Sequence, residues 1–567
     1  MTPMVRLRAL LFTQSTIAEF LTSYFEQRAG SSRELFIGTG KHPLKSKSYN
    51  QPLACTSSSA MSESGDSDVT DDFELFPSRA ALHPDAYAHP IASYPQEILG
   101  RIFLFWRDGV WARHLLSGLK GGHHHFGMHA PFVLSSVCRT FREAAHSTPD
   151  LWSFLYIDCS ASKNDYNSKH LLSRLKRTVE LAGDTTRLTL CFQALNVDAF
   201  DTGWFRGMQA LLEPLRTRWG SIIVSFGRNN DLSSCWNIWP LAACNVSVLR
   251  LLGSVEEQAS IVPRTPFLSI CTSLVHLELR NVAYVHQNGV VFPTVQSLSV
   301  GPSAGSVLGQ TSIMHLFRSF PNVIKLRLLA FENSGLTVHA QPWPNMSQLG
   351  RLESLTVSPV LLRTSLQGLQ QRPHLPALMR VSIHFTSSMR DDAPEGAVIE
   401  PDDLSGECSD VDGDDDECSE NARRVEDLCA VGTFLSKSLV ETLTLRGLDR
   451  DFDENLISEK IIQPMNTTRL KHLCLKECSE HTTQVISVVL RPSRIFVNSG
   501  RHSPPERAGY LTHLHSLKLI KCRQVDGPDV VKLVRNAPHW LKVVEMRDTD
   551  IDDESYEEIQ AILSERM

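Results

Sequence analysis

The feature that most constrains this chain is a short apolar pattern that recurs through its second half. Each copy has an apolar residue, two arbitrary residues, a second apolar residue, one intervening residue and a third apolar residue. From Leu249 to Val381 the central position returns every 21 to 29 residues. The copies are Val246/Leu249/Leu251, Leu274/Leu277/Leu279, Val295/Leu298/Val300, Val323/Leu326/Leu328, Leu352/Leu355/Val357, Leu378/Val381/Ile383, Leu439/Leu443/Leu445 (a looser copy), Leu470/Leu473/Leu475, Leu514/Leu517/Leu519 and Leu541/Val544/Met546.

The spacing within each copy predicts a short strand with one buried face. The last two apolar residues lie two apart, so both point to the same side of a strand. One unit is too small to bury this face, and stacking the units in parallel joins their small cores. The period matches the roughly 20–29 residues of leucine-rich repeats. The usual asparagine of that repeat is mostly absent and the connections vary in length. We therefore predict an α/β fold with an irregular leucine-rich-repeat-like solenoid of parallel strands plus helices over residues 165–567.

Composition and charge narrow the classes of partner. The chain has 567 residues, of which 42 % are hydrophobic, and this is enough to form two or more domains. Its net charge is −7. It has no Lys/Arg-rich block, so we expect no nucleic-acid partner and no anionic membrane. No apolar run approaches the ~20 residues that span a bilayer. The thirteen cysteines are scattered without a CxxC pair, which favours a reducing compartment, cytoplasmic and/or nuclear.

Two stretches have the composition of disordered segments. Residues 29 to about 88 are rich in Ser, Gly and Lys and then in acids, and we expect residues 1–88 to be mostly disordered. An acidic insertion at about 390–427 interrupts the repeats and predicts a disordered loop. Within it, Ser409 is followed by acids and is a possible phosphorylation site, where phosphate adds about −1.5 to −2 charge. One hypothesis is that this charge regulates access of a basic substrate to the repeats; the other is a solvated spacer.

Two amphipathic helices are predicted ahead of the repeats. In the first, Ile98, Leu99, Ile102, Phe103 and Trp106 recur at spacings of three and four. A loop rich in glycine and histidine follows. The second helix carries Val133, Leu134, Val137, Cys138 and Phe141, and Ser147-Thr148-Pro149-Asp150 stops it. Next come a short strand from Phe154 to Ile157, a third helix bearing Leu171, Leu172, Leu175 and Val179, and a strand at Leu188-Thr189-Leu190.

Residues 91–157 resemble the F-box of fungal, basidiomycete-type proteins. The resemblance rests on Tyr94-Pro95-Gln96-Glu97-Ile98-Leu99 with Ile102-Phe103, on Val137-Cys138-Arg139-Thr140-Phe141-Arg142, and on the exit Ser147-Thr148-Pro149-Asp150-Leu151-Trp152. Tyr94 and Phe141 stand where the family has leucine and tryptophan, and both keep a large apolar group. In that family a degenerate leucine-rich-repeat-like C-terminal region is a typical sequel.

The resemblance implies a non-enzymatic substrate receptor of an SCF-type E3 ubiquitin ligase. The F-box would dock on the SCF adaptor, and through it on the cullin scaffold, while the repeats bind an unknown protein substrate marked for degradation. No cofactor is implied. The expected adaptor-binding residues are Pro95, Glu97, Ile98, Leu99, Ile102, Phe103, Val133, Leu134, Val137, Cys138 and Phe141. Taken singly, the apolar members among them are also what the core of a helical subdomain needs.

Other motifs give no catalytic or metal site. His123-His124-His125 lies among glycines, without cysteine or carboxylate at ligand spacing, and is interpreted as a solvated loop. Gly38-Thr39-Gly40-Lys41 lacks the first glycine and the final Ser/Thr of a phosphate-binding loop. No nucleophile elbow is present, so no catalytic residue is assigned. Two alternatives stay open: a non-ligase leucine-rich-repeat interaction scaffold, and an enzyme hidden in the repeats.

Overall fold

The computed structural model divides the chain into two compact units. Unit 1 is Met1–Trp152 and unit 2 is Ser153–Met567. The residues that the structure describes are 94–116, 125–159, 165–195, 203–226, 245–253, 259–261, 271–284, 290–303, 313–330, 350–363, 375, 377–385, 414–448, 454–462, 469–478, 482–490, 513–537 and 539–566. The predicted disorder of residues 1–88 lies outside this part of the chain.

The described part of unit 1 is helical. Its elements are α2 (Gln96–Leu116), α3 (His125–Val137), α4 (Arg139–His146) and the 3-10 turn η2 (Pro149–Trp152). The second predicted helix is in fact two, because Cys138 has an extended backbone with φ −156°. Its Sγ accepts a hydrogen bond from the Phe141 N–H at 3.4 Å and so caps α4.

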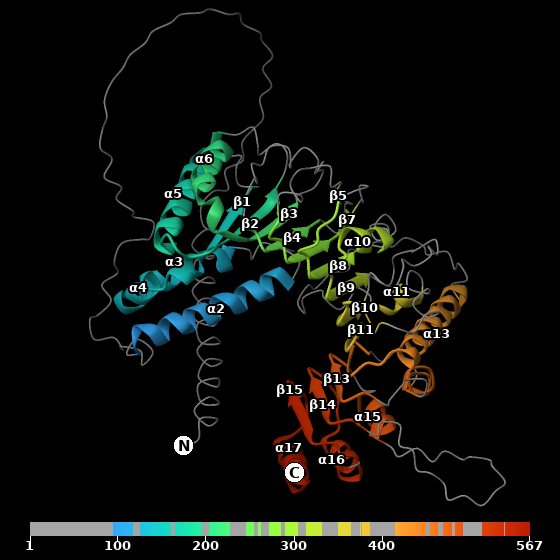
Figure 1. Cartoon of the computed structure of the whole chain (residues 1–567). Helices are drawn as coiled ribbons and strands as arrows, with labels where there is room; N and C mark the ends of the chain where they lie inside the picture. Colours follow the sequence, from blue (N-terminus) through green and yellow to red (C-terminus); the bar gives the residue numbers. More distant parts are fainter. Residues whose placement is uncertain are drawn as a thin grey trace, which may run out of the picture. The chain divides into compact units, whose positions relative to one another are not determined.

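The predicted repeat strands form one parallel sheet of 13 strands, visible in Figure 1 from β1 to β15. Its strands are β1 (Phe154–Asp158), β2 (Leu188–Leu195), β3 (Trp219–Phe226), β4 (Val248–Leu252), β6 (His276–Arg280), β8 (Ser297–Ser303), β9 (Lys325–Ala330), β10 (Ser354–Val357), β11 (Arg380–His384), β12 (Thr442–Arg446), β13 (His472–Lys476), β14 (Ser516–Ile520) and β15 (Val543–Arg547). A separate parallel pair joins β5 (Ala259–Ile261) to β7 (Val282–Tyr284). The prediction of a repeat solenoid is confirmed.

Register shows that the repeats were identified at the correct positions. Leu249 of β4 pairs with Leu277 of β6, and the same position continues through every later strand to Val544 of β15. The position two residues on forms a second row, from Leu251 to Met546. From β4 to β14 both rows are buried, because each strand presents alternate residues to the helical side.

The sheet also begins earlier than the sequence predicts. Leu155 of β1 pairs with Leu190 of β2, which pairs with Ile222 of β3 and then Leu249 of β4. The first buried row therefore starts at Leu155, within the segment 91–157 that was assigned to the F-box. Unit 1 ends at Trp152, so β1 does not belong to the helical segment. It is the first strand, or rung, of the repeat sheet in unit 2.

Helices line one side of this sheet, as Figure 1 shows for α10, α11, α13, α15 and α16. The helical elements of unit 2 are α5 (Asp165–Ala182), α6 (Gly203–Leu212), η5 (Glu213–Arg218), α10 (Ile313–Ser319), α11 (Pro359–Arg363), α13 (Asp414–Lys437), α14 (Glu454–Ile457), the π-turn η7 (Ser458–Ile462), α15 (Thr482–Leu490), α16 (Gly527–Asn536) and α17 (Asp553–Glu565). The predicted third helix is α5, and Gly183, with φ +63°, follows its last residue.

Helix α13 corrects the predicted acidic loop at about 390–427. Residues 386–413 lie outside the described part, but from Asp414 the chain is helical. The last part of the loop prediction is therefore wrong. Leu428, Val431 and Leu435 recur at helical spacing and are buried. On the same helix, Asp427 and Glu426 pair with Arg363 of α11, at 2.6 and 2.9 Å. Acidic residues also suit the first turns of a helix, whose N-terminal end is electropositive.

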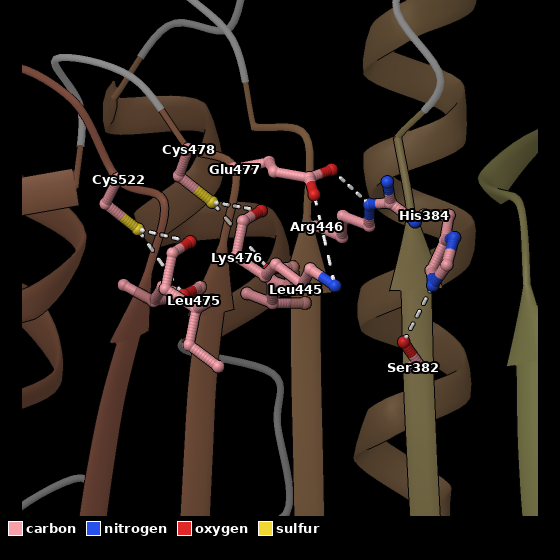
Figure 2. A network of polar contacts seen from close by, with 10 residues as sticks. Ser382, His384, Leu445, Arg446, Leu475, Lys476, Glu477, Cys478 and Cys522 are labelled. Atoms are coloured by element: carbon pink, nitrogen blue, oxygen red, sulfur yellow. Dashed lines mark hydrogen bonds and ion pairs between the residues drawn. The ribbon is translucent and has the colours of Figure 1, made fainter. Parts of the chain in front are cut away.

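The ends of the strands are held by tight contacts between rungs. Cys478 and Cys522 stand three residues after the buried rows, the position that asparagine or cysteine takes in leucine-rich repeats. Their Sγ–H groups donate to the carbonyl oxygens of Leu445 and Leu475 in the preceding rungs, at 3.7 and 3.4 Å. Figure 2 shows both sulfurs aimed at the neighbouring strand.

The last strand carries a further contact. In a parallel pair, alternate residues direct their N–H and C=O groups to the same neighbour. Val543 N–H bonds to the carbonyl of His515, so the Val544 carbonyl points to the edge that β14 does not cover. Gln560 of α17 donates its Nε2–H to that carbonyl at 3.2 Å. One acceptor on the edge of β15 is therefore satisfied by a side chain.

Gly447, which directly follows β12 and has φ +74°, lies close to the backbone that follows β11. A Cβ there would lie 2.3 Å from the carbonyl oxygen of Phe385. Gly183→Ala is a matched control, because Gly183 also has positive φ but nothing lies within 4 Å of its Cβ position. We expect Gly183→Ala to lower the free energy of unfolding by about 1 kcal/mol through backbone strain, and Gly447→Ala to lower it by more, about 3 kcal/mol. Chemical denaturation of the full chain measures both; equal losses would contradict the contact.

Candidate interaction surfaces

Five of the eleven residues expected to bind a partner lie in the core of unit 1. Leu99, Ile102, Phe103, Leu134 and Phe141 are buried. The rings of Phe103 and Phe141 meet edge to face, with centroids 5.1 Å apart. These five side chains hold the three helices together. Their side chains are therefore part of the core of unit 1 and not of its surface.

The other expected residues keep exposed area. Pro95 and Glu97 are exposed at the start of α2, and Ile98, Val133, Val137 and Cys138 are partly exposed. The Pro95 carbonyl accepts hydrogen bonds from Ile98 N–H and Leu99 N–H at 3.0 and 3.1 Å, which fixes the first turn. The predicted set is thus divided between a core and a surface.

An exposed aromatic residue was missed by the sequence reasoning. Phe105 of α2 is 51 % exposed, and it lies seven residues after Ile98, on the same side of the helix. Tyr94, which is 39 % exposed, lies two residues before the first residue of this helix. We call Tyr94, Ile98 and Phe105 the α2 stripe. The helical period of Ile98, Ile102 and Phe105 was available in the sequence, but periodicity alone does not show that Ile102 is buried while Phe105 is exposed.

The end of unit 1 is fixed by the exit motif. Trp152 is buried and its indole N–H donates to the carbonyl of Ala145 at 2.8 Å. Its ring meets that of Phe132 with centroids 5.1 Å apart. Thr148 donates its hydroxyl to the carbonyl of Ala144 at 2.7 Å, and Arg107 donates to the carbonyl of Asp150. The exit motif therefore packs the chain back onto α3 and α4.

The second surface is the side of the sheet opposite the buried rows. Strand residues that alternate with the buried ones point away from the helices. From β4 onward their central row is polar, and we call this side the polar face. The row consists of Arg250, Glu278, Ser299, Arg327, Thr356, Ser382, Thr444, Cys474, Lys518 and Glu545. Leucine-rich repeats present a continuous strand surface of this kind for binding.

Many charges of the polar face are neutralised in pairs. Glu278 lies 3.3 Å from Arg250 and 2.8 Å from Arg280. Further along, Glu477 pairs with Arg446 and lies 3.9 Å from Lys476. Figure 2 shows this carboxylate between the two cations, above neighbouring strands. Two positive charges therefore share one negative charge at this point.

His384 of β11 lies beside these positive charges, and we call the area around Arg327, His384, Arg446 and Lys476 the cationic region. Its Nε2 is 3.1 Å from the Ser382 hydroxyl (Figure 2). Burial is the largest cause that lowers the pKa of His384, and together with the positive charges of Arg446, Arg327 and Lys476 it brings this pKa to about 3. The imidazole is consequently neutral at pH 7. The strand pairing puts His384 directly beside Arg446. The positive charge of Arg446 therefore repels the protonated form of His384.

A pH-dependence follows from the depressed pKa of His384. In the unfolded chain a histidine has a pKa near ~6.5, so on acidification the unfolded state takes up the proton first. Stability is fully present above about pH 6.5 and falls as the pH drops towards 3, by about 1.4 kcal/mol per pH unit. His384→Gln removes this loss. Denaturation at pH 8, 6 and 5 should give a steeper acid decline in the wild-type chain than in the variant, with parallel behaviour near pH 8. Parallel curves throughout would contradict it.

Neither a metal site nor a membrane span is seen in the described residues. No group of three or more His, Cys, Asp or Glu side chains within them is arranged to hold a metal ion. His125 of the predicted histidine loop is the first residue of α3, while His123 and His124 lie outside the described residues, as does Ser409. None of the described helices is long and apolar enough to cross a membrane.

Comparisons with known proteins give a distant structural likeness. No protein-family model matches the chain, and no curated protein sequence matches it. Among solved structures, an internalin from Listeria monocytogenes is similar at 12 % identity, with 70 % of this chain and 92 % of that chain covered and a TM-score of 0.23. The superposition is poor at that score, and the repeat architecture is established by the strand pairing within the chain itself.

Proposed function

We propose that this chain is the substrate-recognition subunit of an SCF-type E3 ubiquitin ligase. In this proposal unit 1 docks on the SCF adaptor, and through it on the cullin scaffold, while the repeats of unit 2 bind a target protein. The chain itself performs no chemistry. It raises the effective concentration of the target beside a ubiquitin-charged enzyme, which accelerates transfer without a catalytic residue.

The α2 stripe is the observation that carries the proposal. It places exposed apolar side chains on the helix whose sequence resembles the first F-box helix. Interfaces obtain most of their affinity from a few such anchors, with aromatic residues prominent among them. The buried pair Phe103 and Phe141 fixes α2 against α4, so the stripe is presented on a rigid support.

A pulldown of the tagged full-length chain tests the proposal. Phe105→Asp and Ile98→Asp each place a charge on the α2 stripe, where it would be buried without a partner on docking. Each variant should reduce recovery of the SCF adaptor at least about tenfold. Val291→Asp is the matched control, since Val291 is a 50 % exposed valine of unit 2. Adaptor should be recovered with this variant as with the wild type.

Thermal unfolding of each variant separates docking from folding. Phe105→Asp should lower the melting temperature by only a few degrees, because half of this side chain is already in water. Absence of adaptor from the wild-type sample, or full recovery with both stripe variants, would reject the ligase assignment.

A non-ligase interaction scaffold is the second candidate. The observation in its favour is the burial of Leu99, Ile102, Phe103, Leu134 and Phe141. A helical subdomain that only needs a core would require these residues in the same pattern. The scaffold predicts target binding by unit 2 with no adaptor in the pulldown.

A further inference from the structure

The polar face contains a cation for which the described residues provide no hydrogen-bond or ion-pair partner. Arg327 of β9 is half-buried, and its Nε atom is covered without a hydrogen-bond partner. Burial lowers the pKa of its guanidinium; Glu278 opposes this, and Arg280 and Arg446 add to it. Glu278 already pairs with Arg250 and Arg280. A covered, unpaired cationic donor costs stability, so Arg327 is poorly explained by the needs of the fold.

The neighbours of Arg327 enlarge the positive region. Arg446 and Lys476 share the single carboxylate of Glu477, and His384 between them and Arg327 is neutral. Lys325, also on β9, is exposed. The face from β9 to β13 therefore carries excess positive charge. That charge favours an acidic partner and argues against the basic substrate that the acidic insertion had suggested.

The spread of these charges limits the kind of ligand. Neighbouring strands lie about 4.8 Å apart, so β9 and β13 are separated by about 19 Å. One small anion is too short to contact both Arg327 and Lys476. An extended peptide rises about 3.3 Å per residue and presents alternate side chains to one side every ~6.6 Å. Several carboxylates on such a chain can reach successive cations.

The surface between the cations is suited to a peptide. Thr356, Ser382 and Thr444 occupy the central row on β10, β11 and β12, and these small side chains carry hydroxyl groups. A nucleic acid is disfavoured, because the chain has a net charge of −7 and no Lys/Arg-rich block.

We infer that the polar face of strands β9–β13 binds an extended, Asp/Glu-rich segment of a partner protein, with Arg327 as its central contact. The segment crosses the strands and places carboxylates against Arg327, Arg446 and Lys476. The acidic segment would belong to the target protein of the proposed receptor, so this inference rests on the proposed function. Binding of the segment nevertheless requires no adaptor, so the two fail separately.

Fluorescence anisotropy with the full-length chain tests the inference. The probe is a labelled peptide of about eight residues, long enough to cross from β9 to β13, with glutamate at alternate positions. Its counterparts carry glutamine throughout, or glutamine with a single phosphoserine. The glutamate peptide should bind, and its affinity should fall as ionic strength is raised from about 0.05 to about 0.3 M. Both counterparts should bind at least about tenfold more weakly.

The variants locate the site. Arg327→Gln should weaken binding of the glutamate peptide at least about tenfold, because a charged hydrogen bond is lost. It should keep the fold, since Arg327 makes no hydrogen bond or ion pair with another described residue. The matched control is Arg535→Gln on α16, which removes one positive charge from an arginine paired with Glu558 on the helical side. This control should bind the peptide as the wild type does.

The outcomes distinguish the possibilities. No binding of the glutamate peptide, equal binding by Arg327→Gln, or a preference for the phosphoserine peptide would each overturn the acidic-segment inference. The adaptor pulldown with Arg327→Gln should match the wild type. If the chain captures the adaptor but does not bind the acidic peptide, the inference is rejected and the receptor proposal stands. If the chain binds the peptide but does not capture the adaptor, the receptor proposal is rejected and the inference stands.

Discussion

Unit 2 depends on the strict register between its parallel strands. Each strand places the same two positions on the buried side and the residue between them on the other side, so one apolar row meets the next without a gap. Because only these few residues must match, the connecting segments are free to differ. The 62 residues between Val381 and Leu443 illustrate this, since the two leucine-type positions still pair directly.

Sequence reasoning located the rungs from β4 onward because each strand alternates buried and polar residues. Strand β3 was missed, and β2 was predicted only over Leu188-Thr189-Leu190, because Cys191 and Ile223 are buried on the second side as well. A strand buried on both sides has no alternation to detect. Helix α13 was missed for a different reason: its acidic first turns have the composition of a solvated loop, and the apolar period begins only at Leu428.

The candidate surfaces were predictable to different degrees. The apolar period of α2 identified the helix, but periodicity alone does not separate Phe103, which is buried, from Phe105, which is exposed. The cationic region around Arg327 was not predictable from one sequence. Its members come from four strands, separated by connections of unrelated length, and only the register brings His384 beside Arg446. Burial is the largest cause of the depressed pKa of His384, and the charge of Arg446 brought beside it by the register adds to it.

The contact between Gln560 and the Val544 carbonyl has a consequence for self-association. A strand at the edge of a sheet presents unpaired backbone groups to which another chain can add, and parallel solenoids are open to end-to-end growth for this reason. Helix α17 brings an amide to one of those groups from within the same molecule. An incoming strand would have to displace it, so the ladder ends at β15 with one acceptor already taken and polymerisation through this edge is disfavoured.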